Sequence, residues 1–434
     1  MSARHSAAQV APPTIRGWCP GALQPMASGD GLIVRIRIPG GRLDGAALRA
    51  LADLGRRCGN GAFDLSQRAN LQMRGVSERN LPEIHRALAD LGYLARDIAS
   101  EHVQNVIAPP LAGFDPAALI DGGALAGRLE ARLRDDSRLH ALPGKFGFVV
   151  DDGGMMSMAD VDVDIALEAA RIDGDVVIAL RLAGAPDFAA CVAQDAAVDA
   201  ATRLALAFLD LCETYRARRM RRLVAARGAD AVFAAAGLSR RMVARRPAAP
   251  LTAMLGAHAV GARAFLGCAA PFGRWSAGTL DRLADCARAQ GADAFRFTPW
   301  RALLLPGVAP DRATALAAAL GRENFIVDGA DPRLAVAACP GAPACGSASV
   351  RTHESAQALV PLLAGAPPGV RLHVSGCAKG CARPRSAPFT LVGRAGLFDL
   401  VVDGPADGAP VAVALDLAAA HCEIARRMAE VAPT

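Results

Sequence analysis

The sequence is nearly free of lysine and poor in aromatic side chains. Only two of its 48 basic residues, Lys145 and Lys379, are lysine, and Phe, Trp and Tyr together make up 4% of the 434 residues. The net charge is only +6, and no dense run of basic residues is interleaved with aromatic ones, which argues against nucleic-acid binding. The one basic cluster, residues 215–228, is typical of the solvated face of a helix.

Long apolar stretches are also missing. No segment reaches the roughly 18 uninterrupted apolar residues that cross a membrane, and residues 1–16 lack the apolar core of a secretory signal. We therefore expect a cytoplasmic protein, no membrane association and a loose tail over residues 1–15. In that compartment the eleven cysteines are not expected to form disulfides, so clustered cysteines become candidates for metal or redox chemistry.

A duplication organises the chain. At an offset of 232 residues, segment 41–76 matches segment 273–308 at 13 of 36 positions without a gap. Each copy shows the order strand, helix, strand, strand, helix, beginning in the first copy with the alternating "LIVRIRI" and a helix that Asp44 caps. This order predicts a small ferredoxin-like α+β sandwich in each half.

The predicted fold class is therefore α+β, with two ferredoxin-like half-domain repeats interleaved with two mixed α/β domains. We place the half-domains at 16–95 and 256–330, a middle domain at 96–240 and a last domain at 331–434. The Pro/Ala-rich residues 241–255 are interpreted as a linker.

The two copies differ along one strand. Side chains two residues apart share a face of a strand, so the first copy predicts a row of donors and the second an apolar row. The donor row is Arg68, Asn70, Gln72 and Arg74, and the matching residues are Trp300, Ala302, Leu304 and Pro306. Because arginine pairs carboxylates bidentately, we interpret the donor row as a binding face for a ligand rich in carboxylates, although a solvated strand would show the same pattern.

Four of the cysteines form two pairs, Cys339 with Cys345 and Cys377 with Cys381. A zinc site is one interpretation, but the five residues inside the first pair are more than its usual spacing. A redox disulfide is another, but neither pair has the C-x-x-C form. An iron–sulfur cluster suits the longer loops and the small residues around the thiols, and the chemistry favours it.

The cysteine spacing carries a family resemblance. The segments "CPGAPACGSA" and "GCAKGCARP" resemble the cluster motif of the siroheme-dependent nitrite and sulfite reductase superfamily. The order of half-domains, middle domain and cluster domain fits as well, from about residue 20 to 400. The resemblance implies a [4Fe-4S] cluster on Cys339, Cys345, Cys377 and Cys381.

Carried over residue by residue, the resemblance places Arg68 and Lys145 in the tetrapyrrole and anion site. A second lysine of the same motif is Gly147 here, an expected arginine is Gln104, and an asparagine of the cluster motif is Lys379. Loss of two cations argues against binding and reducing an oxyanion such as sulfite, and siroheme is less expected. Because arginine has replaced lysine almost everywhere else, we predict that both Lys145 and Lys379 face the catalytic site.

The segment "RGWCPGALQPMASGDGLIVRI" (16–36) is most similar to a branch of the superfamily that oxidises a reduced tetrapyrrole with O2 and NADH in cobalamin synthesis. This similarity implies that the tetrapyrrole substrate occupies the siroheme pocket. Its carboxylates would bind Arg68, Asn70, Gln72, Arg74 and Lys145. It also implies a mononuclear non-haem iron, contacted by Cys381, for which His102 and His373 are candidate ligands.

NADH has no binding motif in this sequence. No G-x-G-x-x-G follows a strand and opens a helix, so we expect electrons to arrive through a reductase partner. Two alternatives stay open: a siroheme-dependent sulfite or nitrite reductase, and a ferredoxin-like electron carrier that performs no catalysis.

Overall fold

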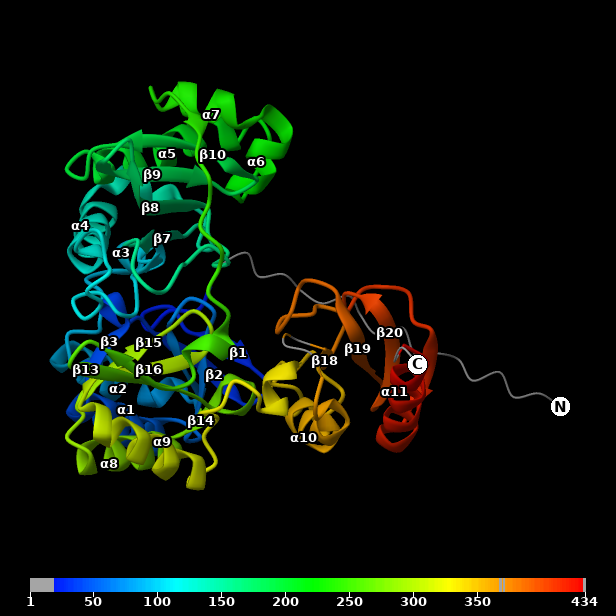
Figure 1. The fold of residues 1–434 in the computed structure, drawn as a ribbon. Helices are drawn as coiled ribbons and strands as arrows, with labels where there is room; N and C mark the ends of the chain where they lie inside the picture. Colours follow the sequence, from blue (N-terminus) through cyan, green and yellow to red (C-terminus); the bar gives the residue numbers. More distant parts are fainter. Residues whose placement is uncertain (1–18, 367–368, 370, 432–434) are drawn as a thin grey trace. The chain divides into compact units, whose positions relative to one another are not determined.

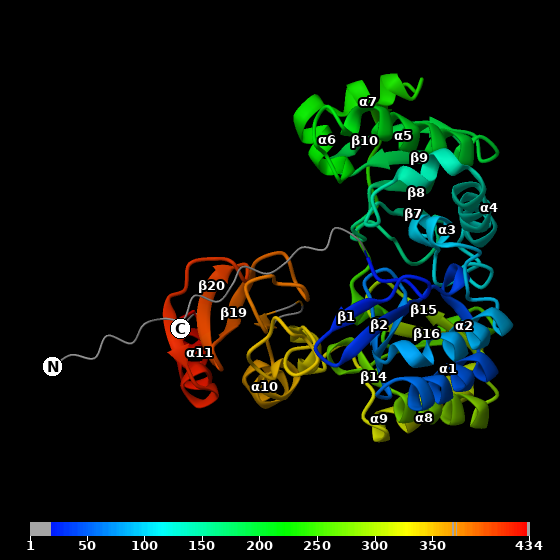
Figure 2. The ribbon, with the colours of Figure 1, turned by 180° about the vertical axis from the view of Figure 1, so that it is seen from behind.

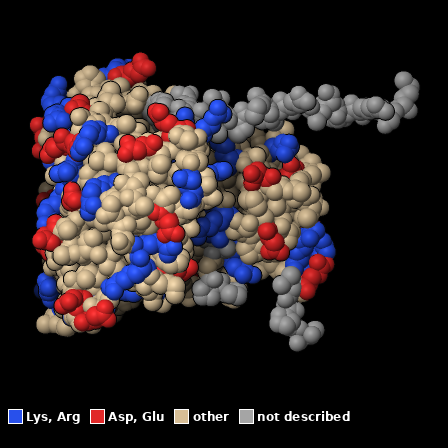
Figure 3. All heavy atoms as spheres, turned by 90° about the horizontal axis from the view of Figure 1, so that it is seen from above, with Lys and Arg blue, Asp and Glu red and all other residues tan. Residues whose placement is uncertain are grey.

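The computed structural model describes residues 19–366, 369 and 371–431, so the predicted tail at 1–15 lies outside the described residues. The chain divides into two compact units, which are described separately. Of the described residues, the smaller unit comprises 27–31 and those from 330 onward, and the larger one comprises 19–26 and 32–329. Within the described ranges, no helix is long and apolar enough to cross a membrane. Acidic and basic side chains are interspersed over the face that Figure 3 shows.

The duplication predicted from the sequence is confirmed element by element in the larger unit. In the first repeat the elements are β2 (Gly31–Ile36), β3 (Arg42–Asp44), α1 (Gly45–Cys58), β4 (Ala62–Leu65), β5 (Leu71–Val76) and α2 (Leu81–Asp90). In the second they are β13 (Arg263–Ala269), β14 (Arg274–Ser276), α8 (Ala277–Ala289), β15 (Ala294–Phe297), β16 (Ala302–Val308) and α9 (Pro310–Arg322). Short β1 (Met26–Ser28) and β12 (Gly256–Val260) precede the repeats.

The equivalence extends to the helix caps. Asp44 accepts a hydrogen bond from the Ala47 backbone N–H at 2.8 Å, and Ser276, 232 residues later, accepts one from Thr279 at 3.0 Å. A side-chain oxygen at this position satisfies a backbone donor that the first turn leaves unpaired. Each cap therefore fixes where the long helix of its repeat begins.

The two repeats exchange a strand. β14 of the second repeat pairs with β4 of the first, and β3 of the first pairs with β15 of the second. The sheets consequently run β2-β5-β4-β14 and β12-β13-β16-β15-β3. Phe63 and Trp275 are neighbours in the first sheet, and both belong to one core that spans the two repeats. Helices α1 and α8 pack together beneath the sheets (Figure 1).

The middle domain is a six-stranded mixed sheet in the order β11-β10-β9-β8-β7-β6. Its strands are β6 (Val106–Ile107), β7 (Phe148–Asp151), β8 (Ile165–Ile172), β9 (Asp175–Leu182), β10 (Ala185–Val192) and β11 (Arg241–Met242). Its helices are α3 (Ile98–Val103), α4 (Gly122–Asp135), α5 (Ala197–Cys212), α6 (Met220–Arg227) and α7 (Ala229–Ala235). Helices α4 and α5 lie against the sheet (Figure 2), and their apolar side chains share one core with those of β7, β8 and β9.

Two segments of this domain differ from their predicted form. The basic segment 215–228 is only partly helical, and Arg219 turns inward to the buried carboxylate of Asp164, with Nε to Oδ1 3.0 Å. The predicted linker 241–255 begins with edge strand β11 and is anchored, since Arg245 pairs with Glu168 at 3.0 Å. Buried carboxylates in β8 and directly before it thus hold residues that the local sequence marks as solvated.

The smaller unit is a five-stranded sheet in the order β17-β18-β19-β20-β21. Its strands are β17 (Val336–Ala338), β18 (Leu372–Ser375), β19 (Ala387–Arg394), β20 (Leu397–Gly404) and β21 (Ala412–Leu415), with helices α10 (Thr352–Leu359) and α11 (Leu417–Val431). β17, β18 and β19 are parallel, and the remaining pairs are antiparallel. The mixed α+β class predicted from the sequence is confirmed in both units.

Candidate functional site

Both cysteine loops begin at the same edge of the smaller sheet. β17 and β18 are parallel neighbours, with Ala338 opposite Val374, so their carboxyl ends meet at one edge. Cys339 follows β17 directly, and Cys377 lies two residues beyond β18. The topology therefore brings the two pairs, which are separated in the chain, to one place.

The thiols share an electrostatic environment. The Gly376 backbone N–H donates to Cys339 Sγ at 3.2 Å. Burial raises the pKa of Cys339, and the neighbouring Cys345 and Cys377 raise it further. Desolvation likewise raises the pKa of Cys381, followed by Cys339, Cys377 and Cys345, while Lys379 lowers it. Four thiols within one another's fields, together with an ammonium group, form a donor set that binding of a cation would stabilise.

Small residues leave room for these loops. An ideal Cβ on Gly376 would lie 2.5 Å from Ala348 Cβ and 3.5 Å from Cys339 Sγ. On Gly29 it would lie 2.3 Å from the Pro343 carbonyl oxygen, and the neighbouring Ser28 hydroxyl donates to the Ala344 carbonyl at 2.7 Å. The segment 27–31 thus supports the loop that carries Cys345.

The described thiols are not arranged around a single metal ion. Within the described part of the chain, no three His, Cys, Asp or Glu side chains are placed to hold a single metal ion. His373 is fully buried in β18, whereas His102 belongs to α3 in the larger unit. These two histidines therefore do not form a ligand set within either unit.

Only part of the predicted donor row lies along a strand. β5 begins at Leu71, and Arg68 lies before it in a tight turn where Ala69 has φ 54° and Ser66 N–H donates to the Asn70 carbonyl at 2.9 Å. The turn breaks the strand alternation, so Arg68 is not in register with Gln72. On β5 itself, Gln72 Oε1 accepts from Arg35 Nη2 at 2.8 Å.

Arg74 is a structural residue rather than a ligand-facing one, contrary to the sequence prediction. Its side chain is 2% exposed and its Nη1 lies 3.2 Å from Asp64 Oδ2. Asp64 also pairs with Arg274 of the exchanged strand β14. Two guanidinium groups on one partly buried carboxylate join the repeats, so Arg74 is engaged within the protein.

Arg68 instead reaches across to the loop that carries Lys145. Its Nη2 donates to the Lys145 carbonyl, and an ideal Cβ on Gly147 would lie 2.9 Å from its Nη1. The Gly147 N–H is held by buried Asp164 Oδ2 at 3.1 Å. The side chain of Lys145 remains exposed beside this contact. Glycine at 147 therefore makes space for a guanidinium from the first repeat.

Two further arginines, missed by the sequence prediction, accompany Arg68. The alternation that buries Val34 and Ile36 places Arg35 and Arg37 on the opposite face. Burial, together with the charges of Arg35 and Arg68 and against the opposing effect of Glu101, lowers the pKa of Arg37 to about 10. Burial also lowers the pKa of Arg68, where Arg35 and Arg219 act in the same direction. The site is thus more cationic than the donor row alone suggested.

The apolar row of the second repeat has a different use. Leu304 packs with Leu111, Phe114 and Met156 of the middle domain. Trp300 packs against the same cluster and its Nε1 donates to Asp160 at 3.0 Å. The second repeat therefore packs this face of its strand against the middle domain, whereas the first repeat keeps polar side chains there.

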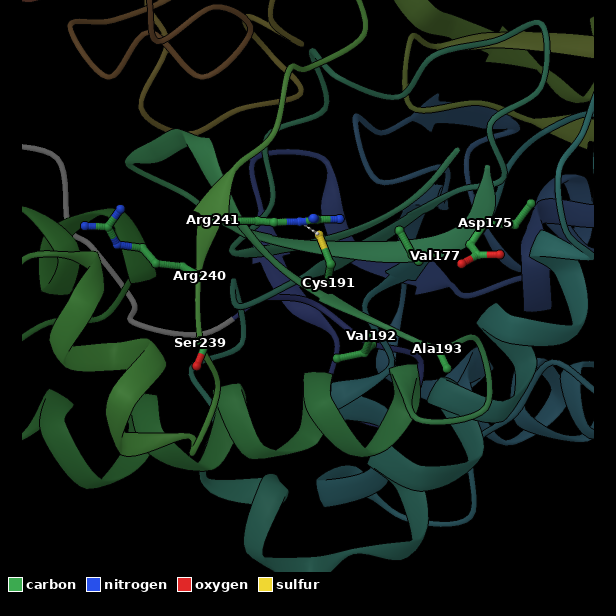
Figure 4. Close-up of a pocket in the computed structure, with 9 residues that line it drawn as sticks. Asp175, Val177, Cys191, Val192, Ala193, Ser239, Arg240 and Arg241 are labelled. Carbon is green, nitrogen blue, oxygen red and sulfur yellow. Dashed lines mark hydrogen bonds between the residues drawn. The ribbon is translucent and has the colours of Figure 1, made fainter. Parts of the chain in front are cut away.

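An open groove elsewhere in the middle domain holds none of the predicted site residues. It is lined by β9, β10 and the approach to β11, with Cys191 Sγ accepting from Arg241 Nε at 3.3 Å (Figure 4).

Both repeats match the model of the nitrite/sulfite reductase ferredoxin-like half domain, at residues 24–91 and 258–323. Ferredoxin–nitrite reductase of Synechococcus elongatus is 27% identical over 83% of this chain and 76% of its own length. The structure of the Mycobacterium tuberculosis NirA protein superposes with a TM-score of 0.72 over 92% of this chain and 80% of that one, at 21% identity. The fold is that of the nitrite and sulfite reductases.

A precorrin-3B synthase of Sinorhizobium sp is 34% identical over 92% of this chain and 85% of that protein. The chain belongs to the precorrin-3B synthase family, and it is an oxidoreductase.

Proposed function

We propose that the protein converts precorrin-3A with O2 to its C20-hydroxylated γ-lactone, a step of aerobic cobalamin synthesis. The observation that carries this proposal is the 34% identity with a precorrin-3B synthase over nearly the whole chain. In this reaction one oxygen atom of O2 enters the substrate, and two electrons from NADH reduce the other to water. We further propose that the protein is cytoplasmic.

The first repeat and the middle domain supply groups suited to a polycarboxylate substrate. Arg68 contacts the Lys145 loop, Gln72 lies on β5 with Arg35 bound to it from the neighbouring strand, and Asn70 precedes β5. In the proposal these groups bind the carboxylates and hold the macrocycle in one orientation. Lys145 and Lys379 supply exposed ammonium groups as point donors.

We propose that Cys339, Cys345, Cys377 and Cys381 hold a [4Fe-4S] cluster. The four thiols, the small residues around them and the Gly376 N–H on Cys339 fit such a group. When bound, the cluster would supply one-electron transfer. A reductase partner would deliver electrons from NADH, since two of the relatives are named as ferredoxin-dependent.

A mononuclear non-haem iron does not fit the described residues in the same way. The described residues contain no group of three ligating side chains placed for a single ion. Siroheme is not required either, since the pocket that would hold it is assigned to the substrate.

Anaerobic purification followed by iron and sulfide analysis, a visible spectrum and addition of precorrin-3A, O2 and a reductase tests the proposal. We expect about four irons per chain, no macrocycle absorption and a product heavier by one oxygen. The second candidate, siroheme-dependent nitrite or sulfite reduction, is favoured by the nitrite reductase relatives. Intense macrocycle bands and consumption of nitrite would replace our proposal with it.

A further inference from the structure

Lys379 is the only charged side chain in the two cysteine loops. The first loop, residues 339–350, contains no acidic or basic residue, and in residues 374–382 the lysine is the single exception. It lies in an exposed position between Cys377 and Cys381. Only two of the 48 basic residues of the chain are lysine, so a lysine at this position is unusual for this composition.

The backbone on both sides of Lys379 is held by its neighbours. Gly380 is buried in the left-handed region, with φ 59°, and an ideal Cβ there would lie 3.2 Å from Ala406 Cβ. On the other side, the Ser375 hydroxyl donates to the Cys377 carbonyl at 2.7 Å. The lysine therefore belongs to a loop with a defined conformation.

The charge of Lys379 opposes the effect of the thiols on one another. Burial and then the neighbouring thiols raise the pKa of Cys381, whereas Lys379 lowers it, so the field of the ammonium group reaches this sulfur. The Gly376 backbone N–H donates to Cys339 Sγ at 3.2 Å in the same loop pair. Both groups stabilise negative charge on sulfur.

Lys379 would act differently on the two oxidation states of a bound cluster. Four thiolates carry more negative charge than an iron–sulfur core offsets, and reduction adds one further negative charge. A cation beside the cluster therefore stabilises the reduced form more than the oxidised form and raises the reduction potential. The neutral asparagine that the family resemblance leads one to expect at this position would lack this effect.

We propose that Lys379 raises the reduction potential of the cluster, so that a weaker reductant suffices than a neutral residue at this position would require. This proposal rests on the proposed function, because it presupposes a cluster on the four cysteines. In this role Lys379 acts on the reaction through the cluster.

Redox titration of the cluster-loaded protein measures the effect without turnover. The absorbance of the cluster is followed against potential in the wild type and in Lys379→Gln. At the wild-type midpoint and low ionic strength, we expect the ratio of reduced to oxidised cluster to fall about three- to tenfold in the variant. A tenfold change corresponds to about 59 mV for one electron. Because Lys379 is exposed, added salt should diminish the difference.

Two further variants separate charge from structure. Lys379→Arg keeps the positive charge and should titrate close to the wild type. Arg426→Gln removes an exposed charge of α11, which packs on β20 and β21 and not on the strands that carry the cysteine loops, and should leave the potential unchanged. An unchanged potential in Lys379→Gln, or an equal fall in Lys379→Arg, would overturn the proposal.

The charge can also be removed after the cluster has assembled, because the chain has only two lysines. In a Lys145→Arg background, acetylation neutralises Lys379 as the one remaining side-chain amine, and the potential should fall as in Lys379→Gln. The Lys145→Arg, Lys379→Arg double variant, treated in the same way, controls for the terminal amine. This experiment decides the matter if Lys379→Gln does not assemble its cluster, and an unchanged potential after acetylation would overturn the proposal.

The failures of this proposal and of the proposed function are distinguishable. A wild type without iron and sulfide would overturn both the cluster and the role of Lys379. The expected fall in potential in a protein that is inactive toward precorrin-3A would support this role and contradict only the assigned reaction.

Discussion

The guanidinium of Arg68 occupies space that any side chain at position 147 would claim, because an ideal Cβ on Gly147 would lie 2.9 Å from Nη1. The contact joins the turn of the first repeat to the Lys145 loop of the middle domain. The family resemblance leads one to expect a lysine at position 147, but here the guanidinium of Arg68, from a distant part of the chain, lies beside Gly147. The site therefore keeps a positive charge in a different geometry.

Gly147→Ala tests this relationship. The added methyl group should displace the Arg68 guanidinium, and we expect the apparent KM for the tetrapyrrole to rise about tenfold with a smaller change in kcat, as for loss of one charged hydrogen bond. Gly127→Ala, on α4 with nothing near its ideal Cβ, is the matched control and should leave both constants unchanged. An unchanged KM in Gly147→Ala would contradict the role assigned to Arg68.

Lys145→Ala tests the role of the Lys145 ammonium group as a donor to the substrate. Loss of a point donor at the site should lower kcat/KM about 10- to 100-fold, while reduction of the cluster by its electron donor stays as in the wild type. Stopped-flow reduction and steady-state turnover measured on the same preparation check both expectations. Unimpaired turnover would contradict the role assigned to Lys145.

Cys381→Ser should prevent assembly of the cluster. A hydroxyl is a poor ligand for iron, so we expect iron and acid-labile sulfide to fall well below the wild-type content. Cys422→Ser, at an exposed position of α11, provides a control thiol outside both loops. Wild-type iron content in Cys381→Ser would show that the four thiols do not share one cluster.

Arg74→Leu should affect stability and not substrate binding. Removing one guanidinium from buried Asp64 leaves the carboxylate only Arg274, so the free energy of unfolding should fall by about 1–3 kcal/mol. Urea denaturation measures this fall, and Arg79→Gln should change it by less than about 0.5 kcal/mol. A rise in KM for the folded fraction would restore Arg74 to the ligand site.

Glu130 gives the stability of the protein a distinct pH dependence. Burial raises the pKa of this carboxyl from 4.5 to about 7, against a lowering by Arg134. Because the folded state holds the proton more tightly than the unfolded state, stability falls as pH rises from about 4.5 through about 7. Glu130→Gln should therefore raise the free energy of unfolding by about 1–3 kcal/mol at pH 8 and by little at pH 4. Equal stabilities at pH 8 would show that Glu130 ionises freely.

The repeat could be predicted from the sequence because the spacing of apolar residues in a helix or a strand is a local pattern, and the same patterns occur in both copies. The strand exchange could not, since β3 and β14 are three residues each and carry no period of their own. The donor row was mistaken at both ends for the same reason. The turn at Ala69 interrupts the alternation before Arg68, and the partner of Arg74 comes from a neighbouring strand.

The cysteine pairs illustrate the opposite case. Their spacing and the family resemblance predicted the four residues without any knowledge of the sheet, and β17 and β18 bring their loops to one edge. Ligation of a cluster by these residues stays a prediction. Arg37 carried no such signal, since its burial depends on how residues 19–24 fold over α3.

Through the exchange of β3 and β14, each repeat supplies the edge strand of the other repeat's sheet. A gene cut between the copies would yield two polypeptides that each expose an unpaired strand and lack part of a common interior. Neither fragment should be recovered in soluble form by itself, whereas production of both together would let them reassemble. This arrangement indicates an ancestor that was a dimer of two identical chains. Each chain gave its partner one strand, and fusion of the two copies then joined them in a single chain.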